Sequence, residues 1–413
     1  MSSRLKYTHQ AFFISSLFVV AFPIWPLRWA VGFIILWLSS ALVSLVLNGK
    51  KDWKKNVALL FLFTALFLYY SFTYLIYDMP DNALQYLERR LSLLVFPLGF
   101  YFVDPGFQKK QRNWLLLTFE LASFVLTVYI TVETIPLIVK HWNIINMGTG
   151  FNWAFRHHVE SIVGIHPTYL SVFLLFAVFL KMHRLVEQDM AQPWWYVSWN
   201  AFQMALMLLC CLLLSARGPL IAFGVGLLVY FFQVNWKRTI FGLAAALPIV
   251  VLLFLNVPAI GGRFTELIGA SASPAEKELN STNIRHEIYK CNSELLAEHW
   301  LLGIGIGNVQ PALNSCYERN GQEKLREMEF NTHNQYAQIW LSNGLPGLII
   351  FILMLGIPLF ISIKKKDLPY QVFLIMMIIC FFTENLLARQ HGVVFFAFFN
   401  ALFAFHLISP IKR

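Results

Sequence analysis

Arg217, Arg285 and His333 are the residues of this chain that we consider first as candidates for chemistry on an anionic substrate. An arginine presents a planar fork of N–H donors that fits phosphate oxygens, and a histidine can accept a proton near neutral pH. Arg285 and His333 belong to residues 256–347, a polar stretch between two apolar segments that also contains Arg263. We therefore expect the chemistry of this protein in or beside that stretch.

Arg217 stands in the run SARGPL, at the outer end of one apolar segment, and Pro219 suits the first turn of the next helix. A guanidinium so close to hydrocarbon is costly unless an anion meets it. The run therefore indicates an anion site. Interfacial snorkelling of Arg217, or an internal ion pair, is the alternative.

A second helix should begin at 280–282, where Asn, Ser and Thr are possible caps. Apolar residues then repeat at helical spacing, as Ile284, Ile288, Cys291, Leu295 and Trp300. This pattern predicts an amphipathic helix that lies on the membrane surface or on the helix bundle. Arg285 and Tyr289, four residues apart, should share one edge of it, although Arg285 could equally be a solvated charge.

His333 lies in NTHNQYAQIWLSNGLPGL, where Asn331 or Thr332 can cap a short helix, Gly344 can end it and Pro346 can start the next. The imidazole would then stand in the first turn. There the helix dipole favours the neutral ring, which a general base requires. A capping or structural histidine is the alternative.

Two other features of the polar stretch have simpler explanations. The glycine-rich run at 303–308 has no strand before it, so a tight turn between packed helices explains it better than a phosphate-binding loop. Cys291 and Cys316 could form a disulfide in an oxidising compartment; otherwise Cys291 is a buried apolar residue and Cys316 is unrelated to it. No metal-ligand spacing accompanies them, and we expect neither metal nor cofactor.

The composition is that of an integral membrane protein: 58% of the residues are hydrophobic, 16% aromatic and 13% charged. A soluble core of this size would need more charged surface. The net charge of +10 would suggest nucleic acid in a soluble protein, but the basic residues here form short clusters between apolar runs. Such clusters indicate membrane topology.

The apolar pattern predicts an all-α polytopic protein with about twelve transmembrane helices. The segments are 10–25, 28–47, 57–77, 90–103, 113–133, 167–182, 195–214, 218–234, 239–255, 345–363, 370–386 and 392–408. The segments 90–103 and 167–182 are short for a straight span and could be tilted or re-entrant. We treat residues 1–413 as one membrane domain, with 256–347 as a helical loop between spans nine and ten.

Clusters of Lys and Arg at 50–55, 109–112, 364–366 and elsewhere fall on one side of this arrangement. The positive-inside rule then places these clusters and both termini in the cytoplasm. The stretch 256–347 would face outward, into the periplasm if the protein lies in a bacterial inner membrane. The first apolar segment is read as a retained helix, since no small-residue cleavage site follows it.

The order of SARGPL, of an Arg-bearing helix followed by WLLGIGIGN, and of THNQYAQIWLSNGLPGL resembles the O-antigen ligase and O-antigen polymerase superfamily of bacterial envelopes. The resemblance covers roughly 215–408, and IHPTYLS at 165–171 and TENLLARQHG at 383–392 are also similar to members of this group. It implies a membrane glycosyltransferase of the C type. Such an enzyme moves a glycan from undecaprenyl pyrophosphate to a hydroxyl and uses neither nucleotide sugar nor ATP.

The resemblance also implies roles for single residues. The two pyrophosphate-binding arginines of the family match Arg217 and Arg285, and its catalytic histidine matches His333. An acidic residue in a late periplasmic connection matches Glu384, although ligases more often have Asp there, which leaves its role open. Supporting roles fall to Tyr289, Asn334, Glu384 and Arg389. The implied reaction is a metal-independent displacement that inverts the anomeric carbon.

The acceptor distinguishes the members of this superfamily. A ligase transfers to a lipid A core sugar, a polymerase to another carrier-linked repeat unit, and a related oligosaccharyltransferase to a protein side chain; we favour the ligase. A polysaccharide transporter or flippase is the alternative from another class. A transporter should carry ionisable residues near mid-membrane in both halves, whereas the site residues of this chain gather at one face. An enzyme is therefore favoured.

Overall fold

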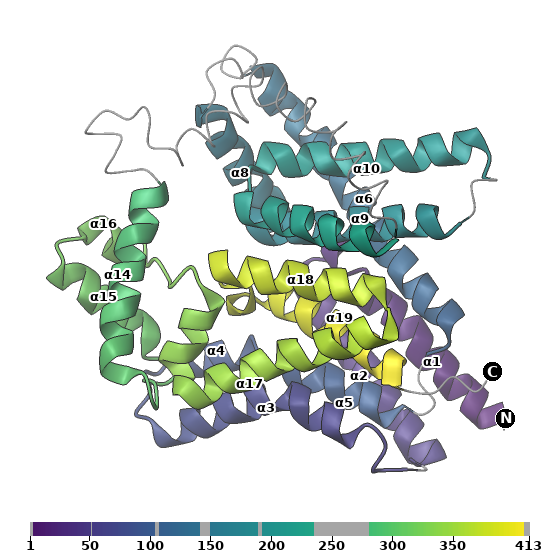
Figure 1. Ribbon diagram of the computed structural model, residues 1–413, viewed down its shortest axis with the longest axis horizontal. Helices are drawn as coiled ribbons and strands as arrows, with labels where there is room; N and C mark the ends of the chain where they lie inside the picture. Colours follow the sequence, from purple (N-terminus) through teal and green to yellow (C-terminus); the bar gives the residue numbers. More distant parts are fainter. Residues whose placement is uncertain are drawn as a thin grey trace.

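The computed structural model describes residues 3–50, 52–103, 107–140, 149–188, 192–234 and 281–408, and these residues fold into helices joined by short connections (Figure 1). The helices of the first half are α1 (Ser3–Val20), η1 (Phe22–Ile24), α2 (Leu27–Asn48), α3 (Val57–Ile76), α4 (Ala83–Glu88), α5 (Ser92–Phe102), α6 (Lys109–Lys140), α8 (Thr149–Val163), α9 (Pro167–Glu187), α10 (Trp194–Leu214) and the helix Arg217–Val234. Those of the second half are α14 (Ser281–His299), α15 (Val309–Arg319), α16 (Glu323–Glu327), α17 (Gln335–Lys365), α18 (Leu368–Thr383), η2 (Leu386–Ala388) and α19 (Gln390–Ile408). The predicted span 239–255 and Arg263 lie outside the described residues.

Eight of the described helices are long and apolar enough to cross a membrane, and each coincides with a predicted apolar segment. They are α2, α3, α6, α9, α10, the helix Arg217–Val234, α17 and α19. The predicted segments 10–25, 90–103 and 370–386 correspond to the helices α1, α5 and α18. With 11 residues in α5 and 16 in α18, these two are shorter than the roughly 20 residues of a straight span. The predicted class, a polytopic helical membrane protein, is confirmed.

One predicted segment is longer in the structure than its apolar pattern suggests. The segment 167–182 becomes α9, which has 21 residues and continues to Glu187. Lys181 and Arg184 extend this helix because both pair with the carboxylate of Glu120 on α6, at 3.6 and 2.6 Å. Charges in an apolar interior are tolerated when they are paired. With 21 residues the helix is long enough to span a membrane, so the structure does not support a re-entrant element at this position.

The centre of the bundle is formed by α9 and α19. In their apolar windows 72% and 78% of the residues are buried, against at most 50% in the other spans. A helix that is apolar on all sides belongs in an interior. Phenylalanines of α19 fill this core and contact one another and α9; Phe395, for example, lies 4.7 Å from Phe173 between ring centroids. The other spans surround these two and expose many large apolar side chains, as a lipid-facing surface would.

The connections that carry the predicted basic clusters meet at one end of the bundle. The Lys50 Nζ after α2 donates to the Tyr101 carbonyl of α5, 2.6 Å away. Arg112 at the start of α6 pairs with Asp367 at the start of α18, also at 2.6 Å. The helices α14–α16 lie at the opposite end (Figure 1). The basic clusters of the sequence therefore gather at one end of the folded bundle, opposite to α14–α16.

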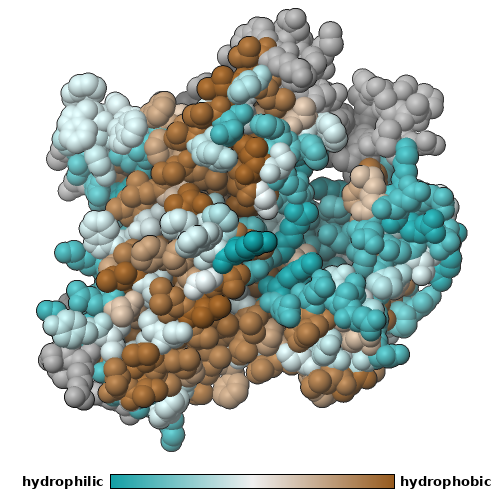
Figure 2. All heavy atoms as spheres, turned by 180° about the vertical axis from the view of Figure 1, so that it is seen from behind, coloured by the Kyte–Doolittle hydropathy of each residue, from teal (hydrophilic) through white to brown (hydrophobic). Residues whose placement is uncertain are grey.

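The helices α14, α15 and α16 form a small hydrophobic core of their own, which rests on Leu341 of α17. Ile288, Cys291 and Leu295 of the predicted stripe are buried in it, so α14 lies on the bundle. The prediction was wrong for Trp300, which follows the end of α14 and is 49% exposed. Figure 2 shows hydrophilic residues gathered over this subassembly and a broad hydrophobic band over the other helices.

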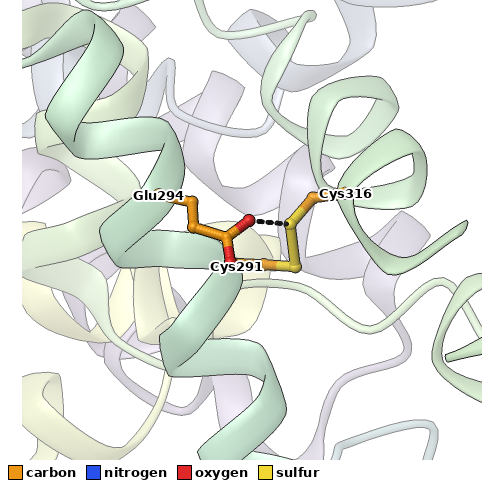
Figure 3. Close-up of side chains that lie close together, drawn as sticks. All are labelled: Cys291, Glu294 and Cys316. Atoms are coloured by element: carbon orange, nitrogen blue, oxygen red, sulfur yellow. Dashed lines mark hydrogen bonds between the residues drawn. A yellow bond between two sulfur atoms is a disulfide. The ribbon is translucent and has the colours of Figure 1, made fainter. Parts of the chain in front are cut away.

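A disulfide between Cys291 and Cys316 joins α14 to α15 (Figure 3). The carboxylate of Glu294 lies beside it, with one oxygen 3.3 Å from the Sγ of Cys316. Two cysteines and a glutamate at such distances could hold a metal ion, and they are the one such group among the described residues. Because the two sulfurs are bonded to each other, the group is a covalent link between helices and not a metal site.

The chain of α17 breaks at Gly344, whose φ of 63° and ψ of −169° are not helical. The predicted end of a short helix at this glycine is therefore correct. The break frees the carbonyls of Leu341 and Ser342, which accept hydrogen bonds from Ile304 and Gly305 at 2.8 and 2.9 Å. In return, Leu345 N–H donates to the carbonyl of Trp300, at 3.0 Å. The glycine-rich run is thus a turn that docks on the broken helix through its backbone.

This docking predicts that Gly344→Ala destabilises the protein. A β-carbon at Gly344 would lie 2.2 Å from the Leu301 carbonyl oxygen. The backbone conformation of Gly344 is also essentially confined to glycine and costs other residues on the order of 1–3 kcal/mol. The control is Gly356→Ala on the same helix, where a β-carbon meets nothing within 4 Å. Thermal unfolding of the purified proteins in detergent should show a lower Tm for the first variant and an equal or higher Tm for the second. Equal Tm values would contradict this account of the break.

The disulfide predicts a specific thiol count. Without reduction, denatured protein should expose the three thiols of Cys210, Cys211 and Cys380 to alkylation, and after reduction all five. Cys316→Ser should lower stability, because the bridge closes a loop with a sequence separation of 25, which is worth about 3 kcal/mol in the chain-entropy model. Mass spectrometry of the alkylated protein makes this measurement. Five reactive thiols before reduction would rule out the bridge.

Candidate functional site

One cavity of about 500 Å³ opens where the ends of several helices meet, and it is lined by Arg217, Arg285, His333 and Glu384. Its other walls come from α8, the first turn of α9, the start of the helix Arg217–Val234 and the segment before α17. These four residues are distant in sequence and belong to four different elements. The structure therefore brings the principal predicted site residues to one place.

His333 is positioned by an unusual backbone conformation just before α17. Its φ is +44°, in the left-handed region that costs a non-glycine residue free energy and often marks functional sites. The Oδ1 of Asn331 accepts the His333 N–H at 2.9 Å, and Asn334 caps α17 by accepting from Tyr336 and Ala337. The prediction of Asn331 or Thr332 as the cap was therefore wrong. The imidazole stands ahead of the helix and not in its first turn.

Glu384 faces this imidazole across the end of α18. The Nδ1 of His333 and the Oε1 of Glu384 are 3.5 Å apart, and the side chain of Glu384 is only 7% exposed. Burial alone would raise the pKa of the Glu384 carboxyl, but His333, His166 and the N–H of Asn385 outweigh it and bring this pKa down to about 2. The carboxylate is therefore ionised at neutral pH and would stabilise a protonated His333.

A buried network of polar side chains holds the backbone on both sides of this pair. Asn385, directly after Glu384, hydrogen bonds through its side-chain amide to Thr332 at 2.8 Å and to Gln338 at 3.2 Å. Thr332 directly precedes His333, and its carbonyl accepts from Asn292 of α14 at 3.0 Å. Such buried hydrogen bonds resist rearrangement because each broken bond leaves a buried polar group unsatisfied. The network therefore fixes the relative positions of His333 and Glu384.

The two arginines reach the cavity from different directions. Arg217 is the first residue of its helix, which starts close against α18: a β-carbon on Gly218 would lie 2.3 Å from the Oγ1 of Thr383. This close approach brings the helix start beside Glu384. Arg285 is exposed near the start of α14, which the disulfide and the small core hold in place. Both arginines thus belong to helices that are held in place by contacts with the rest of the protein.

The residues predicted to support the site take different places. Asn334 is the helix cap described above. Arg389 does not line the cavity, but it pairs at 2.8 Å with Glu160 of α8, which does. Tyr289 is outside the lining as well, with its hydroxyl 3.5 Å from the Phe382 carbonyl. Arg389 and Tyr289 therefore contact the elements that carry the cavity and not its interior.

Sequence reasoning gave no role to His166 and the residues of α8. His166 lines the cavity and caps α9, where its Nδ1 accepts from the Thr168 N–H at 3.4 Å. Burial lowers the pKa of His166, although Glu384 and Glu160 act in the opposite direction. Arg156 of α8 adds a third arginine to the lining. The order His–Pro–Thr at a helix start and the run RHH at 156–158 were the available signals.

The arrangement combines arginines for an anion with an imidazole that an ionised carboxylate supports. Residues 202–352 match the family model described as O-antigen ligase. The comparison with curated proteins gave no match. The matched region runs from α10 into the second half of α17, and it contains Arg217, Arg285 and His333. Over this region the chain is therefore similar to the O-antigen ligase family, which supports the resemblance to the O-antigen ligase and O-antigen polymerase superfamily.

Proposed function

We propose that the protein transfers a glycan from undecaprenyl pyrophosphate to an acceptor hydroxyl at the periplasmic face of the inner membrane, and that this reaction joins O-antigen to the lipid A core. The family match supports a glycosyltransferase-like activity in general. The observation that carries the specific proposal is the convergence of Arg217, Arg285, His333 and Glu384 on one cavity.

The charge of the cavity suits a pyrophosphate. The lining contains three arginines, Arg156, Arg217 and Arg285. It also contains two carboxylates, and each of them lies close to a basic side chain. Glu160 is 2.8 Å from Arg389, and Glu384 is 3.5 Å from His333. The starts of α9 and of the helix Arg217–Val234 also open on the cavity, and the positive end of each helix dipole favours an anion. An arginine fork binds phosphate oxygens bidentately and stabilises the charge that gathers on a departing pyrophosphate.

The proposed step is a single displacement. The acceptor oxygen attacks the anomeric carbon and forms the new glycosidic bond, while the bond from that carbon to the pyrophosphate oxygen breaks. His333 takes the hydroxyl proton, and Glu384 stabilises the resulting imidazolium and orients the ring. Attack opposite to the leaving group inverts the anomeric carbon. Because the arginines stabilise the leaving group, this scheme needs no metal ion.

The membrane placement follows from the asymmetry of charge. The basic clusters lie at the end of the bundle opposite to α14–α16, and the positive-inside rule assigns that end to the cytoplasm. The cavity, which α14 helps to line, would then open to the periplasm. A carrier lipid embedded in the bilayer could present its pyrophosphate there.

The acceptor is tested with purified protein, a glycan on undecaprenyl pyrophosphate, and each acceptor class in turn: lipid A core, a second carrier-linked repeat, and a protein substrate. We expect covalent product with lipid A core, detected by mass spectrometry. Product with the carrier-linked repeat alone would replace the ligase assignment with a polymerase. Turnover of the carrier lipid without any covalent product would overturn the enzyme proposal.

Arg285→Ala should lower the transfer rate by about 100-fold or more, because the loss of one preorganised donor to a developing charge costs roughly 3 kcal/mol. Arg285→Lys should recover little, since an ammonium lacks the fork. The matched control is Arg319→Ala, an exposed arginine of α15 outside the cavity lining. Initial rates at saturating acceptor make this measurement. Near wild-type activity in Arg285→Ala would remove this residue from the site.

His333→Gln should reduce turnover by roughly 100-fold or more, because glutamine can hydrogen bond but cannot accept the proton. Binding of the carrier lipid should stay almost unchanged, since the arginines hold the pyrophosphate. His286→Gln is the control, a histidine of α14 with a side chain that is 80% exposed. If His333→Gln kept most of the activity, His333 would be a positioning residue only.

A further inference from the structure

A second pocket lies at the basic end of the bundle, away from the cavity that holds His333. It has a volume of about 750 Å³ and lies between the starts of α6, α10 and α18 and the end of α9. Lys109, Lys110, Arg112 and Arg184 contribute cationic groups to it, and Glu120 and Glu187 contribute carboxylates. The lining therefore carries an excess of positive charge.

Ion pairs between the arginines of the pocket and neighbouring carboxylates do not remove this excess of positive charge. Arg112 Nη1 pairs with Asp367, and Arg184 Nη2 pairs with Glu120, both at 2.6 Å. Lys181 also lies 3.6 Å from Glu120, so that this carboxylate is shared by two cations. Each guanidinium has five N–H donors, and one carboxylate contact occupies few of them. An anion could therefore bind these arginines without breaking either pair.

The wall of the pocket is apolar on the side of α6. Trp114, which lines the pocket, is 51% exposed, and Leu117 lies one turn further along the same helix. Exposed Leu121, Val125 and Val132 continue this stripe at helical spacing along the length of α6. An exposed apolar stripe on a membrane-spanning helix is a path for acyl chains. A basic pocket at the head of such a stripe fits a charged group that is attached to acyl chains.

We propose that this pocket binds the headgroup of an anionic glycerophospholipid, with the phosphodiester at Lys109, Lys110 and Arg112 and the acyl chains along α6. Basic pockets between helices at the cytoplasmic side of a membrane are suited to such headgroups. Trp114 and Tyr196, both in the lining, supply the aromatic side chains typical of the membrane interface. This inference does not depend on the proposed transferase reaction.

The test uses the full chain, purified in detergent and stripped of lipid, with native mass spectrometry as the readout. Dioleoylphosphatidylglycerol and dioleoylphosphatidylcholine are titrated separately, so that the two probes differ in headgroup and not in acyl chains. Wild-type protein should bind phosphatidylglycerol more tightly. The double variant Lys109→Gln/Lys110→Gln should lose affinity for it on the order of tenfold, since each cation near a membrane surface contributes to anionic-lipid binding.

The matched control is Lys364→Gln/Lys365→Gln, which removes the same charge from exposed lysines in the last turn of α17, outside the lining. This variant should keep its affinity for phosphatidylglycerol. Equal binding of the two lipids by wild-type protein would overturn the proposal, as would an equal loss of affinity in the control variant. Displacement of the bound lipid by inorganic phosphate would assign the pocket to a soluble anion instead. Unchanged binding of phosphatidylcholine and an unchanged Tm show that the variants are folded.

Discussion

The break of α17 at Gly344 is the constraint on which the candidate site depends. Inside or near a bilayer, a helix cannot end without partners for its freed carbonyl and N–H groups. The glycine-rich turn supplies these partners through Ile304 and Gly305, and its own backbone can approach so closely only because glycines occupy the contact. The short helix before the break therefore has a fixed position against α14, and His333 lies directly before the residue that caps this helix.

From this anchored helix start, a network of buried amides and hydroxyls extends to the end of α18. Asn385 and Thr332 carry the link, and each is adjacent in sequence to one member of the Glu384–His333 pair. The pair is thus held by the backbone of two elements and does not rely on its own 3.5 Å contact. A preorganised carboxylate of this kind can support an imidazolium without the energetic cost of rearrangement during a reaction.

The charged side chains are arranged differently at the two ends of the bundle. At the basic end, Arg112 and Arg184 are paired with carboxylates from neighbouring helices, which lets charged residues lie inside the bundle. At the other end, the arginines of the cavity outnumber its carboxylates. Both pockets suit anions, but one lies beside an imidazole and a carboxylate, and the other lies beside an apolar stripe. The first arrangement favours a reaction and the second favours binding.

The sequence by itself determined the membrane class, the bounds of most spans, the buried stripe at Ile288 and Leu295 and the end of a helix at Gly344. These features depend on local composition and period, which one segment carries alone. Only the tertiary structure decided that His166 and α8 line the same cavity as Arg285, that α9 continues past its apolar run, and that Asn334 is the cap. The reason is physical: ion pairs such as Arg184–Glu120 and the gathering of helix ends into a cavity depend on contacts between segments far apart in the chain, which no local pattern specifies.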